Sequence, residues 1–261
     1  MQGFQKVVGH QEIITHLQNA ISMNKVSHAY LFGGESGSGK KMMASLFAMT
    51  LQCEKHGVEP CMECPSCKKA QSQNHPDIIY VKHEKPNTIS IDEIRGQLIN
   101  DVMIKPYSSP YKIYIIDEAQ KLTLQAQNAL LKTIEEPPAY AVVMLLADNP
   151  DALLPTISSR CVQLNLKPVG DQLVKDYLMN EMHVPDYQAE VDASLAQGNI
   201  GKAERIARSP EYEETLESAL RMAKYADSMP LYEIVETIKK LTAEKDNIDD
   251  YFCLLYTSDA A

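Results

Sequence analysis

The sequence has no apolar run long enough to cross a membrane. A membrane helix needs about 18 to 20 consecutive apolar residues, and no stretch of the 261 residues approaches that length. The first residues, MQGFQKVVGHQ, also lack the charged and then apolar layout of a signal peptide. We therefore expect a cytoplasmic protein that does not contact a membrane.

Positive charge is also scarce. The chain has 25 lysines and arginines against 35 aspartates and glutamates, which gives a formal net charge of -10. Through Leu166 there are 15 basic and 16 acidic residues, whereas beyond it there are 10 and 19, so the acidic excess lies in the second part. Proteins that bind DNA by neutralising phosphates carry basic faces. An independent DNA-binding role is therefore disfavoured, unless partners supply the positive charge.

The pattern of apolar residues predicts an α/β fold. The segments HAYLF, PDIIYVKH, YKIYIIDEA and YAVVMLLAD are typical of buried strands, and helical patterns such as LTLQAQNALLKTIEE lie between them. Alternating strands and helices indicate a parallel sheet covered on both faces. Beyond Lys167 the patterns are helical only. We expect an α/β domain over 1–166, a small helical domain over 167–210 and a further helical segment over 211–261.

A glycine-rich loop follows the first predicted strand. Gly34, Gly37, Gly39 and Lys40 have the spacing of a phosphate-binding loop, and a helical pattern follows them, which is the context that this motif requires. The alternative, a tight turn without a ligand, would not need the lysine. A working loop continues with Ser or Thr, whose hydroxyl holds Mg²⁺, but here the next residue is Lys41. We expect no Mg²⁺ and no hydrolysis, and leave ATP binding open.

Two carboxylates end the third predicted strand. In an ATPase, an aspartate at the place of Asp117 holds Mg²⁺ and a glutamate at the place of Glu118 polarises the attacking water. Because Lys41 replaces the metal-holding hydroxyl, we interpret both carboxylates as vestigial parts of a nucleotide-binding frame.

Four cysteines are concentrated in the segment CEKHGVEPCMECPSC. Cys53, Cys61, Cys64 and Cys67 supply enough thiolates to close a tetrahedral zinc site. A disulfide is disfavoured in a cytoplasmic chain, and a redox pair would not need four cysteines. An iron–sulfur cluster is the remaining alternative. We predict a structural zinc that folds an insert over about residues 53–67.

The segment PTISSRCVQL contains an arginine near a turn. Arg160 follows a proline-opened turn and precedes an apolar strand. It is either an ordinary surface arginine or a guanidinium that reaches the γ-phosphate of a nucleotide held by a neighbouring subunit.

Together, HAYLFGGESGSGKK, the four cysteines, IIDEAQKLTLQAQNALLKTIEEPP and LLPTISSRC resemble the bacterial clamp-loader subunits of the AAA+ superfamily, over roughly residues 4 to 210. The combination of a degraded phosphate loop with a retained Ser-Arg-Cys motif is similar to the delta-prime type. The resemblance implies an AAA+ domain with a P-loop and a RecA-like sheet, a helical lid and a helical collar. It also implies that Arg160 is an arginine finger that acts in trans on an adjoining motor subunit.

The same resemblance implies partners. These are tau/gamma and delta subunits in a hetero-pentamer that opens the sliding clamp around primed DNA, within a DNA-directed DNA polymerase holoenzyme. Neither ATPase nor polymerase activity is expected of the chain alone. Gly201 stands where the lid of the motor subunit has an arginine, and Asn149 where a polar sensor lies. About fifty residues follow position 210, fewer than a full collar needs, so we expect a truncated collar.

Three functions remain to be distinguished: a non-hydrolysing clamp-loader subunit, an active tau/gamma-type ATPase and a zinc-ribbon nucleic-acid-binding protein. Lys41 and Gly201 disfavour the ATPase. Glu54, Glu59 and Glu63, inside the cysteine-rich insert, disfavour contact with nucleic acid.

Overall fold

The computed structural model of the chain describes residues 3–208, 221, 225 and 229–243. The chain divides into two compact units, Met1–Val169 and Gly170–Ala261. Within the described residues, none of the helices has both the length and the apolar character that crossing a bilayer requires.

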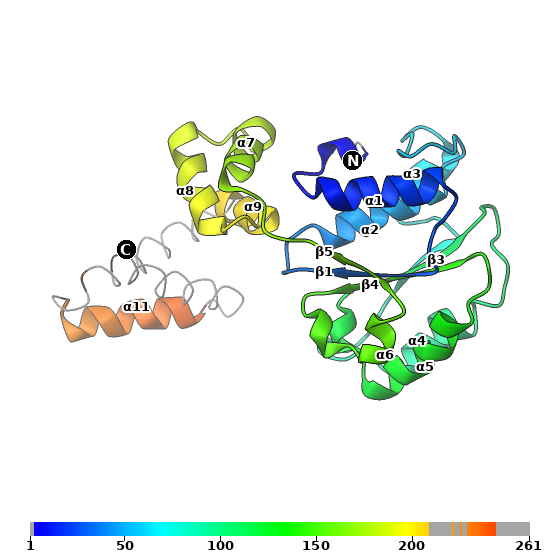
Figure 1. Ribbon diagram of the computed structural model, residues 1–261. Coiled ribbons are helices and arrows are strands. Elements are labelled where there is room, and N and C mark those ends of the chain that lie inside the picture. The colour runs from blue at the N-terminus through cyan, green and yellow to red at the C-terminus, as the bar shows by residue number, and fades with distance from the viewer. Residues whose placement is uncertain (1–2, 209–220, 222–224, 226–228, 244–261) are drawn as a thin grey trace. The chain divides into compact units, whose positions relative to one another are not determined.

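The first unit is built on a five-stranded parallel sheet with the strand order β2-β3-β4-β1-β5 (Figure 1). The strands are β1 (Ala29–Gly33), β2 (Ile78–Val81), β3 (Lys112–Ile116), β4 (Ala141–Ala147) and β5 (Val162–Asn165). Every residue of β1, β3 and β4 is buried. Because both faces of a parallel sheet are covered, its inner strands are apolar throughout rather than alternating.

Helices pack on both faces of this sheet (Figure 1). One face carries α1 (Gln11–Ser22), α2 (Lys40–Leu51) and α3 (Pro65–Gln71), and the other carries α4 (Ile91–Ile94), α5 (Leu124–Glu135) and α6 (Pro155–Ser158). Short 3₁₀ turns are η1 (Phe4–Lys6), η3 (Ala119–Lys121) and η4 (Pro150–Ala152), and α4 continues as a π-helical turn, η2 (Arg95–Ile99). The predicted α/β fold is confirmed.

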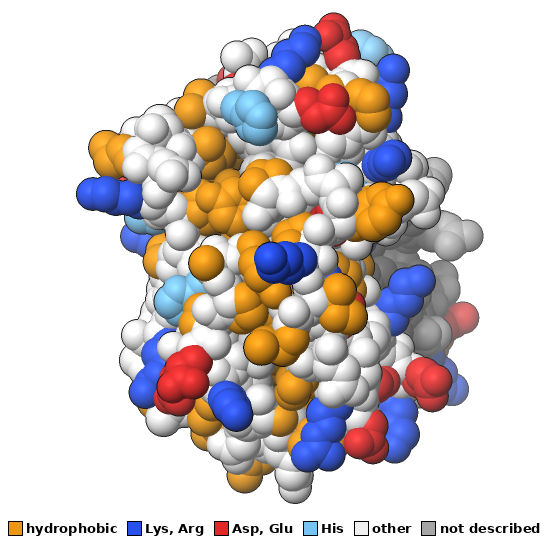
Figure 2. Space-filling model, turned by 90° about the vertical axis from the view of Figure 1, so that its right-hand side faces the viewer, with side chains coloured by type: hydrophobic (Ala, Val, Ile, Leu, Met, Phe, Trp, Pro, Cys, Tyr) orange, Lys and Arg blue, Asp and Glu red, His pale blue; other side chains and the backbone are white. Residues whose placement is uncertain are grey.

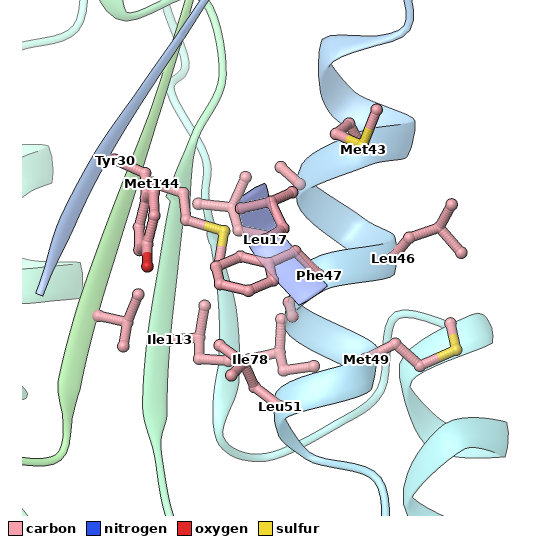
Figure 3. Close-up of a cluster of buried hydrophobic side chains, with 14 of the residues drawn as sticks. Leu17, Tyr30, Met43, Leu46, Phe47, Met49, Leu51, Ile78, Ile113 and Met144 are labelled. Atoms are coloured by element: carbon pink, nitrogen blue, oxygen red, sulfur yellow. The ribbon is translucent and has the colours of Figure 1, made fainter. Parts of the chain in front are cut away.

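Helix α2 is anchored on the sheet by aromatic and aliphatic side chains (Figure 3). Phe47 is fully buried and meets the ring of Tyr30 edge-on, with ring centroids 5.1 Å apart. Such an aromatic pair contributes about 0.5–1.5 kcal/mol beyond the burial of its surface. Met144 of β4 and Leu17 of α1 complete the surroundings of this ring. The packing holds the first turn of α2, and the loop before it, against the ends of β1 and β4.

Helix α4 is an element that the sequence patterns above did not predict. It begins with a capping box, in which Ser90 Oγ accepts from the Glu93 N–H and Glu93 Oε2 accepts from the Ser90 N–H. This reciprocal pair satisfies two backbone donors at the start of a helix. The spacing Ser-x-x-Glu before an apolar residue is a signal that could have located α4.

The second unit begins with three packed helices, α7 (Asp171–Met182), α8 (Asp186–Ala196) and α9 (Ile200–Arg208). Their buried side chains include Val174, Leu178, Ala193 and Ile206. A further helix, α11, spans Leu231–Ala243. The predicted collar segment, 211–261, lies outside the described residues except at 221, 225 and 229–243.

Candidate functional site

The loop between β1 and α2 has the backbone that its glycines predict. Gly34, Gly37 and Gly39 have φ values of 147°, 88° and 94°, a region that residues with a side chain rarely adopt. A Cβ atom on Gly34 would lie 2.7 Å from the Leu166 carbonyl oxygen, closer than real contacts allow. Glycine is therefore required at this position for space as well as for backbone angle.

The loop borders a pocket of about 360 Å³. The residues that line it are Ser36, Gly37, Gly39, Lys40, Lys41, Met42, Asp117, Glu118 and Asp148. The fold thus brings the predicted loop residues together with the carboxylates that follow β3. The start of α2 also faces this space, and helix N-termini favour anions because their first N–H groups have no partner within the helix.

Lys40 is buried and held by the loop itself. Its Nζ donates to the Gly34 and Glu35 carbonyl oxygens at 2.7 and 2.8 Å. The same ammonium lies 2.7 Å from Asp148 Oδ1. The second oxygen of Asp148 accepts from the Gln120 side chain at 3.2 Å. The lysine that would contact phosphates is thus already neutralised by a carboxylate of the pocket.

Lys41 pairs with the aspartate that would hold a metal. Its Nζ lies 3.0 Å from Asp117 Oδ2, and both side chains are partly exposed. Mg²⁺ requires oxygen ligands in near-octahedral geometry, whereas an ammonium group only donates and cannot be a ligand. A positive charge beside Asp117 also repels a divalent cation. The residues at this position therefore do not fit Mg²⁺.

Glu118 is engaged on both carboxylate oxygens. Oε1 pairs with the ammonium of Lys121, and Oε2 lies 3.2 Å from His83 Nε2. Lys121 also donates to the Pro86 carbonyl oxygen, which fixes its position. A carboxylate held in this way has less freedom to orient and polarise an attacking water.

The polar residue after β4 that lines the pocket is Asp148, rather than the predicted Asn149. The Asn149 side chain accepts from the Asp151 N–H and caps η4. Asparagine and aspartate readily bond to the backbone two residues on, and this local bond engages the side-chain oxygen of Asn149. Asp148, which no sequence motif indicated, joins the phosphate-loop lysine to Gln120.

Four cysteines converge between the end of α2 and the first turn of α3. The Sγ atoms of Cys53, Cys61, Cys64 and Cys67 all lie within 4.8 Å of one another. Those of Cys61 and Cys67 are 3.9 Å apart, close to the roughly 3.8 Å that tetrahedral coordination with zinc–sulfur bonds of about 2.3 Å requires. The donor set and its spacing therefore fit one zinc ion with no open position.

Backbone N–H groups surround this cluster. They donate to the sulfurs of Cys53, Cys61 and Cys64 at 3.3 to 3.4 Å. For Cys61, donors from Glu63 and Cys64 lower the pKa to about 6, which favours the thiolate. Burial instead raises the pKa of Cys67. A metal ion would overcome that cost, because coordination deprotonates a thiol outright.

The insert is tied to the rest of the first unit by polar contacts. Glu59 accepts from the Phe4 N–H at 2.8 Å and from the Gln18 side chain at 2.7 Å. The buried His75 lies 3.0 Å from Ser66 Oγ, and its Nδ1 accepts from the Asp77 N–H. His75 therefore has a structural place outside the four-sulfur cluster.

Arg160 lies between α6 and β5 and does not line the pocket. Its side chain is 41% exposed, with Nη2 2.9 Å from Glu135 Oε1 at the end of α5. Nη1 donates to the Thr156 carbonyl oxygen. These contacts hold the guanidinium at the surface of the unit. In the second unit, Gly201 lies in the first turn of α9, where the family resemblance would place an arginine.

A parallel sheet with a glycine-rich loop between β1 and α2, and carboxylates after β3, defines a P-loop protein of the AAA+ type. The fold is similar to the Thermotoga maritima RuvB Holliday junction branch migration motor, with a TM-score of 0.53 and 18% identity over 96% of this chain and 74% of that chain. At this identity the similarity concerns the fold alone.

Sequence comparison is more specific. The family model described as DNA polymerase III, delta subunit, matches residues 9–170. The chain is 38% identical over 208 residues to DNA polymerase III subunit tau of Bacillus subtilis (strain 168), covering 77% of this chain and 36% of that protein. It is 35% identical over 207 residues to DNA polymerase III subunit delta' of the same organism, covering 79% of this chain and 61% of that protein. The chain belongs to the clamp-loader family of DNA polymerase III subunits.

The chain thus spans about a third to three fifths of the length of these two relatives. These relatives include both the tau type and the delta' type. Family membership therefore does not distinguish the two roles, and the geometry of the site has to be used instead.

Proposed function

We propose that the chain is a delta-prime-type subunit of the clamp loader. It keeps the frame of a nucleotide-binding subunit but does not hydrolyse ATP. It presents Arg160 to ATP held by an adjoining tau/gamma subunit, while the loader, which also contains a delta subunit, opens the sliding clamp around primed DNA.

The observation that carries this proposal is that both carboxylates of the hydrolytic position are paired with cations of the same chain. Asp117 pairs with Lys41 and Glu118 pairs with Lys121, while His83 Nε2 lies 3.2 Å from the second oxygen of Glu118. ATP hydrolysis needs a metal that neutralises the phosphates and a group that orients water. This arrangement therefore supports a subunit that does not hydrolyse ATP.

The position of Arg160 gives further support. Its guanidinium is partly exposed and lies outside the chain's own pocket. A planar, permanently charged group with several donors suits contact with a phosphate of another subunit. A partly exposed pair such as Arg160–Glu135 is worth only about 0–1 kcal/mol, so it can open on assembly.

Zinc is proposed as a structural component of the same subunit. Thiolates must stay reduced to bind the metal, which favours the cytoplasm as the place of action. Direct contact of the chain with DNA is not part of the proposal. On the face drawn in Figure 2, positive and negative side chains are interspersed around the edge and apolar ones occupy much of the middle.

The alternative is an active tau/gamma-type motor, which the similarity to tau proteins favours. Reconstitution separates the two. The chain alone should release no phosphate from ATP above background, and a loader assembled with tau/gamma and delta subunits should load clamps only when the chain is present. Steady turnover by the pure chain, abolished by Lys40→Ala, would establish the motor instead.

A further inference from the structure

The pocket beside the phosphate loop contains an ammonium group, that of Lys41, at the position where a metal-dependent loop holds Mg²⁺. In a metal-dependent loop, Mg²⁺ bridges an aspartate and the phosphate oxygens. Here the Lys41 ammonium lies 3.0 Å from Asp117, the residue that would hold that metal. An ammonium has three donors, so it can contact Asp117 and a phosphate oxygen at the same time.

We propose that the pocket binds a polyphosphate chain, such as that of a nucleoside di- or triphosphate, without a divalent metal, and that Lys41 takes the electrostatic place of the ion. This inference goes beyond the proposed function and does not depend on the role of Arg160. It follows from the misfit between this site and Mg²⁺.

The loop backbone and the start of α2 suit an anion, although the pocket lining also contains the carboxylates Asp117, Glu118 and Asp148. The loop keeps the positive-φ backbone at Gly37 and Gly39 that such loops use, and a twelve-residue helix begins at Lys40. The volume of about 360 Å³ is within the range of small-molecule sites.

The pairing within the pocket is compatible with entry of a ligand. The Lys41 and Asp117 side chains are 58% and 39% exposed, so water screens their pair and rearrangement costs little. Asp148 keeps its contact with Gln120 if the phosphates displace it from Lys40. A single positive charge at Lys41 supports binding but supplies no water activation, so binding and hydrolysis become separable.

The test is isothermal titration calorimetry of the 261-residue chain with ATP, ADP and inorganic pyrophosphate, each in excess EDTA and in excess MgCl₂. We expect binding in EDTA, with a dissociation constant that Mg²⁺ changes by less than about threefold or weakens, since threefold is about 0.65 kcal/mol. Equal affinity for ATP and pyrophosphate would mean that the pocket recognises the phosphates alone. Weaker binding of pyrophosphate than of ATP would mean that the pocket also contacts the nucleoside.

Two variants test the assignment to Lys41 in opposite directions. Lys41→Thr restores the hydroxyl and frees Asp117, so binding in EDTA should weaken at least about tenfold, a loss of about 1.4 kcal/mol, and should become dependent on Mg²⁺. Asp117→Asn removes the competing carboxylate, so binding in EDTA should strengthen. The control is Lys55→Thr, which breaks the similarly exposed Lys55–Glu63 pair away from the pocket and should leave binding unchanged.

Three results would overturn the inference. They are the absence of binding by the wild-type chain in both buffers, a wild-type affinity that Mg²⁺ strengthens about tenfold or more, and unchanged affinity in both Lys41→Thr and Asp117→Asn. Because the assay uses the chain alone and measures binding, its outcome is independent of the clamp-loading test for the proposed function.

Discussion

Arg160 and Glu135 form an ion pair within one subunit, with Nη2 and Oε1 2.9 Å apart. Glu135 is the last residue of α5, and Arg160 follows α6. The pair connects the segment that precedes β4 to the segment that precedes β5. If Arg160 acts on a nucleotide of a neighbouring subunit, its ion pair with Glu135 must first break.

The first prediction concerns the arginine. Arg160→Ala should leave folding and zinc content intact but lower ATP hydrolysis by the adjoining motor in a reconstituted loader. Arginine fingers contribute on the order of 10³–10⁵ in rate, and we expect the lower end or less, because other motor sites mask part of the loss. Arg160→Lys should rescue poorly, because a point charge lacks the guanidinium fork. Wild-type turnover and clamp loading by loaders that contain the alanine variant would show an ordinary surface arginine.

The second prediction concerns its partner. Glu135→Gln should raise ATP turnover of the loader by up to about fivefold, since an exposed pair restrains the arginine by at most about 1 kcal/mol. The melting temperature of the isolated chain should not change measurably. Glu136→Gln, at the adjacent position, is the matched control. A fall in turnover with Glu135→Gln would mean that the glutamate positions the arginine rather than competing for it.

The third prediction concerns the cysteines. Elemental analysis should find one zinc per chain, and Cys64→Ser should lower both metal content and thermal stability, because the free energy of metal binding contributes to folding. Cys161→Ser changes a cysteine outside the cluster and should keep the metal. Stoichiometric zinc in the Cys64→Ser variant, or the absence of zinc from the wild-type chain, would contradict the predicted zinc site.

The fourth prediction compares two glycines. Gly34→Ala should destabilise the protein by about 1–3 kcal/mol, because it places a side chain at an unfavourable backbone angle and against the Leu166 carbonyl. Gly96→Ala is the control, because a Cβ there meets nothing within 4 Å, and it should be neutral or stabilising by up to about 1 kcal/mol. Urea unfolding of both variants measures the difference, and equal stabilities would contradict the backbone argument.

The fifth prediction concerns pH. N–H donors from Ser90 and Glu84 and the Ser90 hydroxyl lower the pKa of Glu93 from 4.5 to about 2. A carboxyl group with a lowered folded-state pKa stabilises the fold above its unfolded pKa. This contribution is therefore complete above about pH 4.5 and is lost as the pH falls towards 2.

Glu93→Gln should remove this part of the acid sensitivity. Urea unfolding at pH 7 and pH 3 should show a smaller loss of stability for the variant than for the wild-type chain, while the neighbouring Asp92→Asn serves as control. The same loss in all three proteins would assign the acid sensitivity to other groups.

The parts of the fold that sequence could predict are those with a strong local pattern. Strands β1, β3 and β4 are buried on both faces, so continuous apolar runs revealed them. The cysteine cluster could be predicted from spacing, because Cys61, Cys64 and Cys67 form two overlapping C-x₂-C steps and Cys53 lies eight residues upstream. Helix α4 was missed because four residues and a π-helical turn provide too little periodicity.

The contacts within the pocket could not be predicted in the same way. Asp148 and Lys40 are 108 positions apart, and only the folded structure reveals that Asp148 rather than Asn149 lines the pocket. Likewise, the sequence placed Lys41 after the phosphate-loop lysine, but only the packing of β3 beside β4 brings Asp117 to it. Choices of this kind depend on tertiary geometry.

The strand order has a consequence for synthesis of the chain on the ribosome. The partners of β1 are β4 and β5, which begin at Ala141 and Val162. More than 100 residues must therefore be made after β1 before either of its edges can be paired. At about 5–20 residues per second this delay is roughly 5 to 20 s, during which an apolar strand has two open edges. Nascent chains stalled before Ala141 should consequently be the species most dependent on chaperones.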